Sequence, residues 1–97
     1  MAIQLTTDQI KFIKQTLGSE LIGVDYRIFG SRAKGTAKPY SDVDIILIGP
    51  APVLLNILSR IEEIFSESDL PFKIDLVDLK RISTEFQDKI RSEWQVF

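Results

Sequence analysis

Length, composition and charge exclude several classes of protein. The chain has 97 residues, of which 44% are hydrophobic and 27% charged, and its net charge of −2 argues against a protein whose main task is to grip a nucleic acid backbone. It contains neither cysteine nor histidine, which excludes disulfides, thiolate or imidazole metal sites and a serine–histidine–aspartate triad. Catalysis would rely on carboxylates, lysine, tyrosine, hydroxyls and hard cations, which prefer oxygen ligands.

The same numbers bound the organisation of the chain. Its length predicts one domain over residues 1–97. No apolar stretch approaches the ~20 residues that a membrane span needs. The opening sequence MAIQLTTDQIK lacks the basic and apolar regions of a signal peptide. We therefore expect a cytoplasmic protein that does not enter a membrane.

The first third of the chain predicts a helix followed by a strand. Thr6 and Gln9 have the spacing of a capping box, which marks a helix start. Apolar residues then recur at helical spacing as far as Leu17, and Gly18 predicts the end of the helix. Apolar and polar residues alternate over the segment 24–29, which predicts a strand with one face more buried than the other.

The middle of the chain predicts a loop, a buried strand and a second helix. Gly35 and Pro39 break regular structure, so the segment 32–41 holds at most one short helical turn. The segment 43–48 is rich in β-branched residues, which favours a strand buried on both faces. Pro52 suits the first turn of the next helix. The apolar stripe of that helix consists of Leu54, Ile57, Leu58, Ile61, Ile64 and Phe65.

The last third predicts one more strand and one more helix. Phe72, Ile74 and Leu76 alternate with polar residues, which indicates a strand. A helix that starts near Ser83 would lie on the core through a stripe repeated every four residues, namely Phe86, Ile90 and Trp94. The apolar tail 94–97 is compatible either with packing or with a patch for a partner.

The predicted fold class is α/β (α+β), with the order α-β-β-α-β-α around a small mixed sheet. The second and third strands are joined by a helix, so they are expected to run parallel with a right-handed crossover. The first and second strands are joined only by a loop, which allows them to run antiparallel.

Three aspartates are predicted to gather on this sheet. Asp42 and Asp44 stand two residues apart at the head of the second strand, so their side chains project from the same face. Adjacent carboxylates repel each other, which favours a cation between them. Asp75 faces away from the core residues of the third strand, roughly level with Asp44, and would complete a cage for two divalent cations. Asp78 points to the other face and is interpreted as structural.

The loop ahead of these aspartates suits an anion. Gly30 and Ser31 form a turn that could offer backbone N–H groups and a hydroxyl to a phosphate. Arg32 and Lys34 add positive charge, either as solvent-facing loop residues or as contacts to a phosphate or a partner. Carboxylates that bind metal beside such a loop indicate metal-dependent nucleotide chemistry.

These motifs resemble the DNA polymerase β-type nucleotidyltransferase superfamily. The resemblance rests on Gly30-Ser31, ten intervening residues, Asp42-Val43-Asp44, and Asp75 on a later strand. The short chain and the segments GSRAKG, SDVDI and KIDLVDL are similar to the minimal nucleotidyltransferase (MNT) branch of that superfamily. The resemblance covers nearly the whole chain.

The resemblance implies a role for each motif residue. Gly30 and Ser31 would hold the phosphates of a nucleoside triphosphate. Asp42, Asp44 and Asp75 would bind Mg²⁺ in a two-metal site and catalyse transfer of a nucleoside monophosphate, such as AMP from ATP, to a hydroxyl of a partner protein or of a small molecule. Asp75 would also be the candidate base. The resemblance further implies a helical HEPN-type partner, with this chain as the antitoxin of a toxin–antitoxin pair.

Other functions are compatible with parts of the sequence. The chain is too short for a second domain that would hold an acceptor, so a non-catalytic antitoxin-like subunit that neutralises a helical partner by complex formation is the main alternative. The acidic pI and the lack of interleaved basic and aromatic residues disfavour an RNA-binding fold. Length also disfavours an antibiotic-modifying transferase. The sequence leaves the nucleotide, the acceptor and self-association into a homo-oligomer open.

Overall fold

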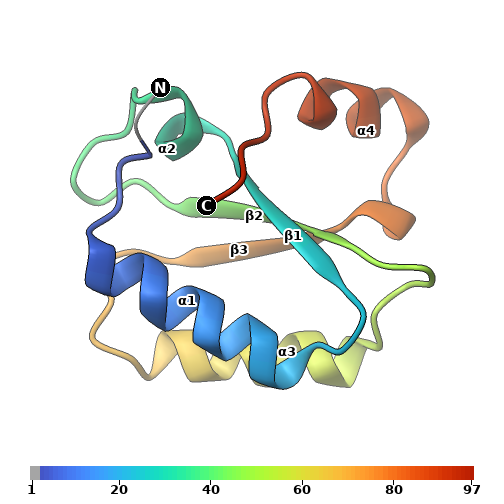
Figure 1. The fold of residues 1–97 in the computed structure, drawn as a ribbon, viewed down its shortest axis with the longest axis horizontal. Coiled ribbons are helices and arrows are strands. Elements are labelled where there is room, and N and C mark those ends of the chain that lie inside the picture. Colours follow the sequence, from blue (N-terminus) through green and yellow to red (C-terminus); the bar gives the residue numbers. More distant parts are fainter. Residues whose placement is uncertain (1–2) are drawn as a thin grey trace.

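The chain folds into a three-stranded sheet with helices on both of its faces (Figure 1). The structure is a computed structural model that describes residues 3–97. Its elements in order are α1 (Thr7–Glu20), β1 (Asp25–Phe29), α2 (Ser31–Lys34), β2 (Val43–Ile48), α3 (Leu55–Ser66), β3 (Ile74–Asp78), the 3-10 turn η1 (Leu79–Arg81) and α4 (Thr84–Arg91). The predicted order α-β-β-α-β-α is confirmed, and α2 is the short helical turn that the prediction allowed in the segment 32–41, although it begins one residue earlier.

The sheet has the strand order β1-β2-β3. As predicted, β1 pairs with β2 antiparallel, while β2 pairs with β3 parallel. The register lays Phe29 of β1 opposite Asp44, and Asp44 opposite Asp75 of β3. The central strand β2 therefore connects the end of β1 to the start of β3 at the level of the aspartates.

Helices α1 and α3 cover one face of the sheet and lie side by side (Figure 1). Helix α1 begins with the predicted capping box, in which Thr6 and Gln9 bond each other's backbone. The core between these helices and the sheet consists of apolar side chains from all three layers, among them Ile13, Leu17, Val43, Ile45, Leu47, Ile61, Phe65 and Ile74. Burial of this apolar surface is the main force that holds the layers together.

A second cluster covers the opposite face, where α4 lies (Figure 1). Ile46 of β2 and Ile90 of α4 are fully buried there, together with Phe29 and Leu79. The tail beyond α4 joins the sheet, because Gln95 forms a β-bridge with Ile28. The end of the chain is thus packed against β1, which supports the packing interpretation of the apolar tail.

Three sequence predictions about the helices are wrong. Gly18 does not end α1, because the helix continues to Glu20 and Leu21 N still donates to Leu17 O. Nothing lies within 4 Å of where a Cβ at Gly18 would be, so this glycine is an exposed position that the helix tolerates. Helix α3 begins at Leu55 rather than at Pro52, with Leu54 as its exposed N-cap.

The stripe predicted for the last helix is the third wrong prediction. Ser83 caps α4 as expected, and Ile90 is buried. Phe86, however, is 42% exposed, and Trp94 lies beyond the end of α4 at Arg91. Trp94 still packs on the second cluster, because the tail turns back toward β1.

Between residues 3 and 97, no helix has the length and apolar character that crossing a bilayer requires.

Candidate active site

Gly30 and Asp44 are in close contact, and this contact joins the glycine–serine turn to the aspartates. Gly30 follows β1, and its φ of 77° lies in the region that favours glycine. A Cβ at this position would overlap with Asp44 Oδ2 and lie 3.2 Å from Asp44 Cγ. The carboxylate therefore occupies the space that a side chain at position 30 would need. This explains physically why a glycine stands ahead of the aspartates.

Asp44 and Asp75 lie side by side on neighbouring strands. They are register partners in the parallel pairing of β2 with β3, as the sequence predicted. In both strands they alternate with residues of the α1–α3 core, Ile45 in β2 and Ile74 in β3, so both project toward the face that carries α4. Asp42 precedes β2 by one residue and is exposed.

Negative charge accumulates at this place. Burial, followed by the charges of Asp75, Asp42 and Glu93, raises the pKa of Asp44 from 3.8 to about 6. Each of these causes disfavours the ionised form of Asp44, and a bound cation would favour it. The donors are carboxylate oxygens, which suit a hard divalent cation such as Mg²⁺.

The carboxylates do not form a ready-made metal cage. Within residues 3–97, no group of three or more acidic side chains is arranged so that it could hold a metal ion. The Asp75 carboxylate instead lies 3.5 Å from the ammonium group of Lys73. The chemistry of the donor set fits a divalent cation, but the side chains would have to turn toward each other in order to share it.

The other predicted phosphate-binding residues lie on α2. Ser31 is its first residue and Lys34 its last, with Gly30 as the N-cap and Gly35 as the C-cap. Ser31 is half-buried and directly follows Gly30, the residue in contact with Asp44. The structure therefore brings Gly30, Ser31, Asp44 and Asp75 together.

Arg32 has a different place from the one expected of a phosphate ligand. It is 6% exposed, and its guanidinium donates to backbone carbonyls of Gln4 at 2.6 Å and of Pro39 and Ser41 at 3.0 Å each. The same group stacks on Phe72, 4.3 Å from the ring centroid. Its donors are used to hold the loop that leads to Asp42. We therefore leave Arg32 out of the phosphate site and interpret it as the anchor of that loop.

Glu93 is a site residue that the sequence analysis missed. Its carboxylate Oε2 lies 2.9 Å from the Lys34 ammonium nitrogen, and its negative charge is one of the causes that raise the pKa of Asp44. Glu93 follows α4, far along the chain from the motifs, and reaches the site because the tail folds back onto β1. No spacing rule could have found it, although the packing of the apolar tail was an available signal.

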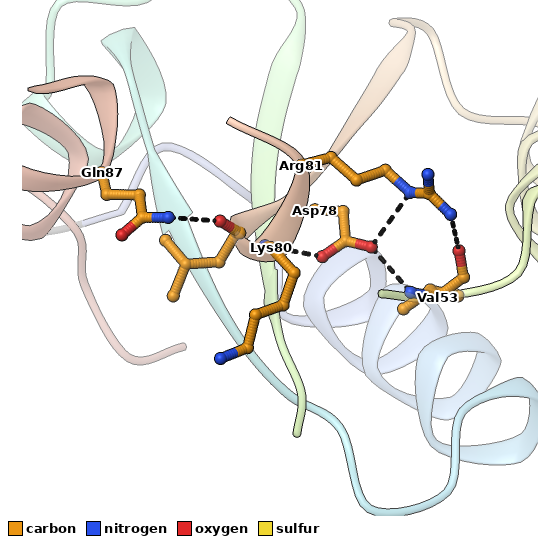
Figure 2. A network of polar contacts seen from close by, with 6 residues as sticks. Val53, Asp78, Lys80, Arg81 and Gln87 are labelled. Atoms are coloured by element: carbon orange, nitrogen blue, oxygen red, sulfur yellow. Dashed lines mark hydrogen bonds and ion pairs between the residues drawn. The ribbon is translucent and has the colours of Figure 1, made fainter. Parts of the chain in front are cut away.

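Asp78 serves the fold, as predicted. It is 4% exposed, and its carboxylate accepts hydrogen bonds from the backbone of Val53 at 2.7 Å and of Lys80 at 2.9 Å. Arg81 lies 3.4 Å from Asp78 and also donates to Val53 O (Figure 2). Asp78 therefore ties the end of β3 to the loop before α3.

Comparison with known proteins assigns the chain to a family. The family model described as nucleotidyltransferase domain matches residues 8–96. The chain therefore belongs to the nucleotidyltransferase domain family, as the sequence resemblance predicted.

Individual relatives are similar over most of the chain. A protein of Haemophilus influenzae named probable protein adenylyltransferase MntA is 38% identical over 96 residues, which are 97% of this chain and 82% of the relative. A crystal structure of a toxin–antitoxin with AMP-PNP has a TM-score of 0.76 at 23% identity, over 88% of this chain and 68% of that chain. A structure described as a minimal nucleotidyltransferase has a TM-score of 0.76 at 19% identity, over 100% and 97% of the two chains. At these identities, the two structures establish the fold alone.

Proposed function

We propose that this protein is a Mg²⁺-dependent adenylyltransferase that transfers AMP from ATP to a hydroxyl group of a partner protein. The contact between Gly30 and Asp44, with Asp75 level on the next strand, carries the proposal. This contact supports a site in which one nucleotide would contact both the glycine–serine turn and the acidic side chains. The relative named as a protein adenylyltransferase and the toxin–antitoxin structure with an ATP analogue support the choice of AMP and of a protein acceptor.

Each motif residue has a distinct task in this proposal. Gly30 and Ser31 hold the phosphates of ATP, and Asp42, Asp44 and Asp75 hold Mg²⁺. The bound cation would supply positive charge to the phosphoryl group and lower the barrier to displacement. Asp44, which burial and its acidic neighbours make reluctant to ionise, gains most from that cation.

The transfer itself is a displacement at phosphorus. The acceptor hydroxyl oxygen forms a bond to the α-phosphorus of ATP, and the bond from the α-phosphorus to the pyrophosphate oxygen breaks. Pyrophosphate leaves, and the acceptor keeps AMP as a phosphodiester. A carboxylate takes the hydroxyl proton, and Asp75 is our candidate for this base because it projects from the same face as Asp44.

We propose that the acceptor is a helical HEPN-type toxin and that this chain acts as its antitoxin. The proposal extends the toxin–antitoxin assembly of the similar structure to this chain.

The test uses ATP labelled in the α-phosphate, Mg²⁺, and the product of the neighbouring reading frame as the acceptor. We expect label on the acceptor with the native chain and none with Asp44→Asn or Asp75→Asn. Loss of one such ligand should cost on the order of 10³-fold in rate. Label that persists in both variants would contradict the proposal.

The Asp75 carboxylate is paired with Lys73, and this observation keeps a second candidate function, neutralisation by complex formation alone. In that case, native chain and Asp44→Asn variant would bind the partner equally and suppress its activity equally, without label transfer. If suppression is instead lost in Asp44→Asn while binding persists, transfer is the function.

A further inference from the structure

An ion pair joins Lys34, at the end of α2, to Glu93, in the segment after α4. Lys34 closes α2, three residues after Ser31, and residues at this spacing share one face of a helical turn. The Glu93 carboxylate lies 2.9 Å from its ammonium nitrogen. Glu93 stands two residues before Gln95, which bridges Ile28 of β1, and the next residue, Phe29, is the register partner of Asp44. The ion pair therefore lies at the end of the sheet that carries the aspartates.

Glu93 is held by its backbone on both sides. Its N–H donates to Ile90 O at 3.0 Å, which extends the end of α4. Two residues later, Gln95 exchanges hydrogen bonds with Ile28, with its N–H 2.8 Å from Ile28 O. The Glu93 side chain is only 18% exposed, whereas that of Lys34 is 50% exposed. The Glu93 carboxylate is therefore held in place by its surroundings, and the ion pair restricts the conformations of the more exposed Lys34 side chain.

This geometry has a consequence for a triphosphate. An ammonium group has three donors, so Lys34 can bond Glu93 and still donate to a phosphate oxygen. Without Glu93, the long lysine side chain would lose more rotamer freedom when it binds a phosphate. Glu93 alone would repel a triphosphate, and the paired Lys34 offsets its charge.

We propose that Glu93 is a positioning residue that holds the Lys34 ammonium group ready for the phosphates of the nucleotide. The inference rests on the proposed function, because it assumes that a nucleoside triphosphate occupies this site. It makes the segment after α4 a part of the nucleotide site, although no motif residue lies there.

The test measures binding of α,β-methylene-ATP and of AMP by calorimetry in the presence of Mg²⁺. The methylene bridge prevents cleavage, so binding is read without transfer. We expect Glu93→Ala to weaken binding of the triphosphate analogue roughly 3- to 10-fold, while AMP binding changes much less. Glu93→Gln keeps an acceptor for Lys34 and should lose less. In a Lys34→Ala background, Glu93→Ala should not weaken binding further.

The matched control is Asp88→Ala. This change removes another ion pair of the same region, between Asp88 and Arg91 at 3.6 Å, and should leave nucleotide binding unchanged. A merely structural role of Glu93 would lower the unfolding temperature and weaken both nucleotides equally, which would overturn the inference. Unchanged or tighter binding of the analogue by Glu93→Ala would also overturn it. If the native chain binds neither nucleotide, the proposed function fails first, and this inference fails with it.

Discussion

At the scale of single residues, Gly30 and Asp44 depend on each other. Gly30 has a positive φ, and the Asp44 carboxylate occupies the space beside its Cα. Asp44 in turn is enclosed by the turn and by acidic neighbours, which raises its pKa to about 6. The site therefore contains both a backbone conformation and a charge that are unfavourable on their own.

We predict that Gly30→Ala displaces Asp44 and lowers the rate of transfer by about 100-fold or more. The strain of its backbone conformation, with φ 77° and ψ −158°, adds a loss of stability of about 1–3 kcal/mol. Gly23→Ala is the matched control, because Gly23 has a φ of 73° and nothing within 4 Å of the Cβ position. It should show the same loss of stability in urea unfolding and keep full activity. Equal activity of the two variants would contradict the role of the Gly30–Asp44 contact.

We also predict that Asp44→Asn stabilises the metal-free protein near neutral pH. The folded-state pKa of Asp44, about 6, lies above its ordinary value of 3.8, so the folded state binds more protons between these values. Its contribution to stability therefore falls as pH rises through this window, and ionised Asp44 destabilises the metal-free protein above it.

Urea unfolding at about pH 7.5 and about pH 4 measures this effect. The gain from Asp44→Asn should be present at the higher pH and small at the lower one. Added Mg²⁺ should stabilise the native chain and not the variant, because the cation binds the ionised carboxylate. A variant less stable than the native chain at the higher pH would disprove the electrostatic account.

The sequence predicted some of these residue relations and not others. Asp44 and Asp75 are register partners on neighbouring strands. This could be predicted, because local sequence patterns indicate both the alternation of each strand and the parallel crossover between the strands. The contact of Gly30 with Asp44 depends on the register between β1 and β2, which no local pattern contains. The loop anchored by Arg32 and the approach of Glu93 both depend on partners far away in the chain.

At the scale of elements, Arg32 joins α2 to the loop before β2 and to the segment before α1. We predict that Arg32→Lys destabilises the protein by about 2–3 kcal/mol, because a compact ammonium cannot reach several carbonyls at once and leaves buried acceptors unpaired. Thermal unfolding measures the loss. The matched control is Arg60→Lys, whose side chain is 70% exposed in its pair with Glu20 and should change stability little.

Asp78 joins β3 to the loop before α3 in the same way (Figure 2). We predict that Asp78→Asn destabilises the protein by roughly 1–3 kcal/mol, since one carboxylate oxygen becomes an amide that faces a backbone donor. Denaturant unfolding thus gives opposite signs for the asparagine variants of Asp44 and Asp78. The same sign for both would show that burial alone decides their energetics.

The elements themselves were largely predictable, and their ends were not. All three strands follow from alternation and β-branched runs, and the caps Thr6 and Ser83 follow from their hydroxyl side chains. The end of α1 and the start of α3 were misplaced, because glycine and proline bias a helix boundary without fixing it. Phe86 and Trp94 share a helical spacing, but α4 ends between them.

At the scale of the whole molecule, the two faces of the sheet differ in what they carry. The face under α1 and α3 holds most of the apolar core, and α4 lies over the opposite face (Figure 1). Strand alternation directs Asp44 and Asp75 to that opposite face, next to the smaller cluster. Changes in the large core should therefore act on stability alone, whereas changes around the aspartates should also act on chemistry. The tail that follows α4 belongs to the second face.

The most direct measurement is a crystal structure with Mn²⁺ in place of Mg²⁺ and with α,β-methylene-ATP, in which anomalous scattering locates the metal. We predict that the anomalous peak lies within bonding distance of carboxylate oxygens of Asp44 and Asp75, with the phosphates at Gly30 and Ser31. A peak bound elsewhere, or a nucleotide seated away from Gly30, would contradict the account.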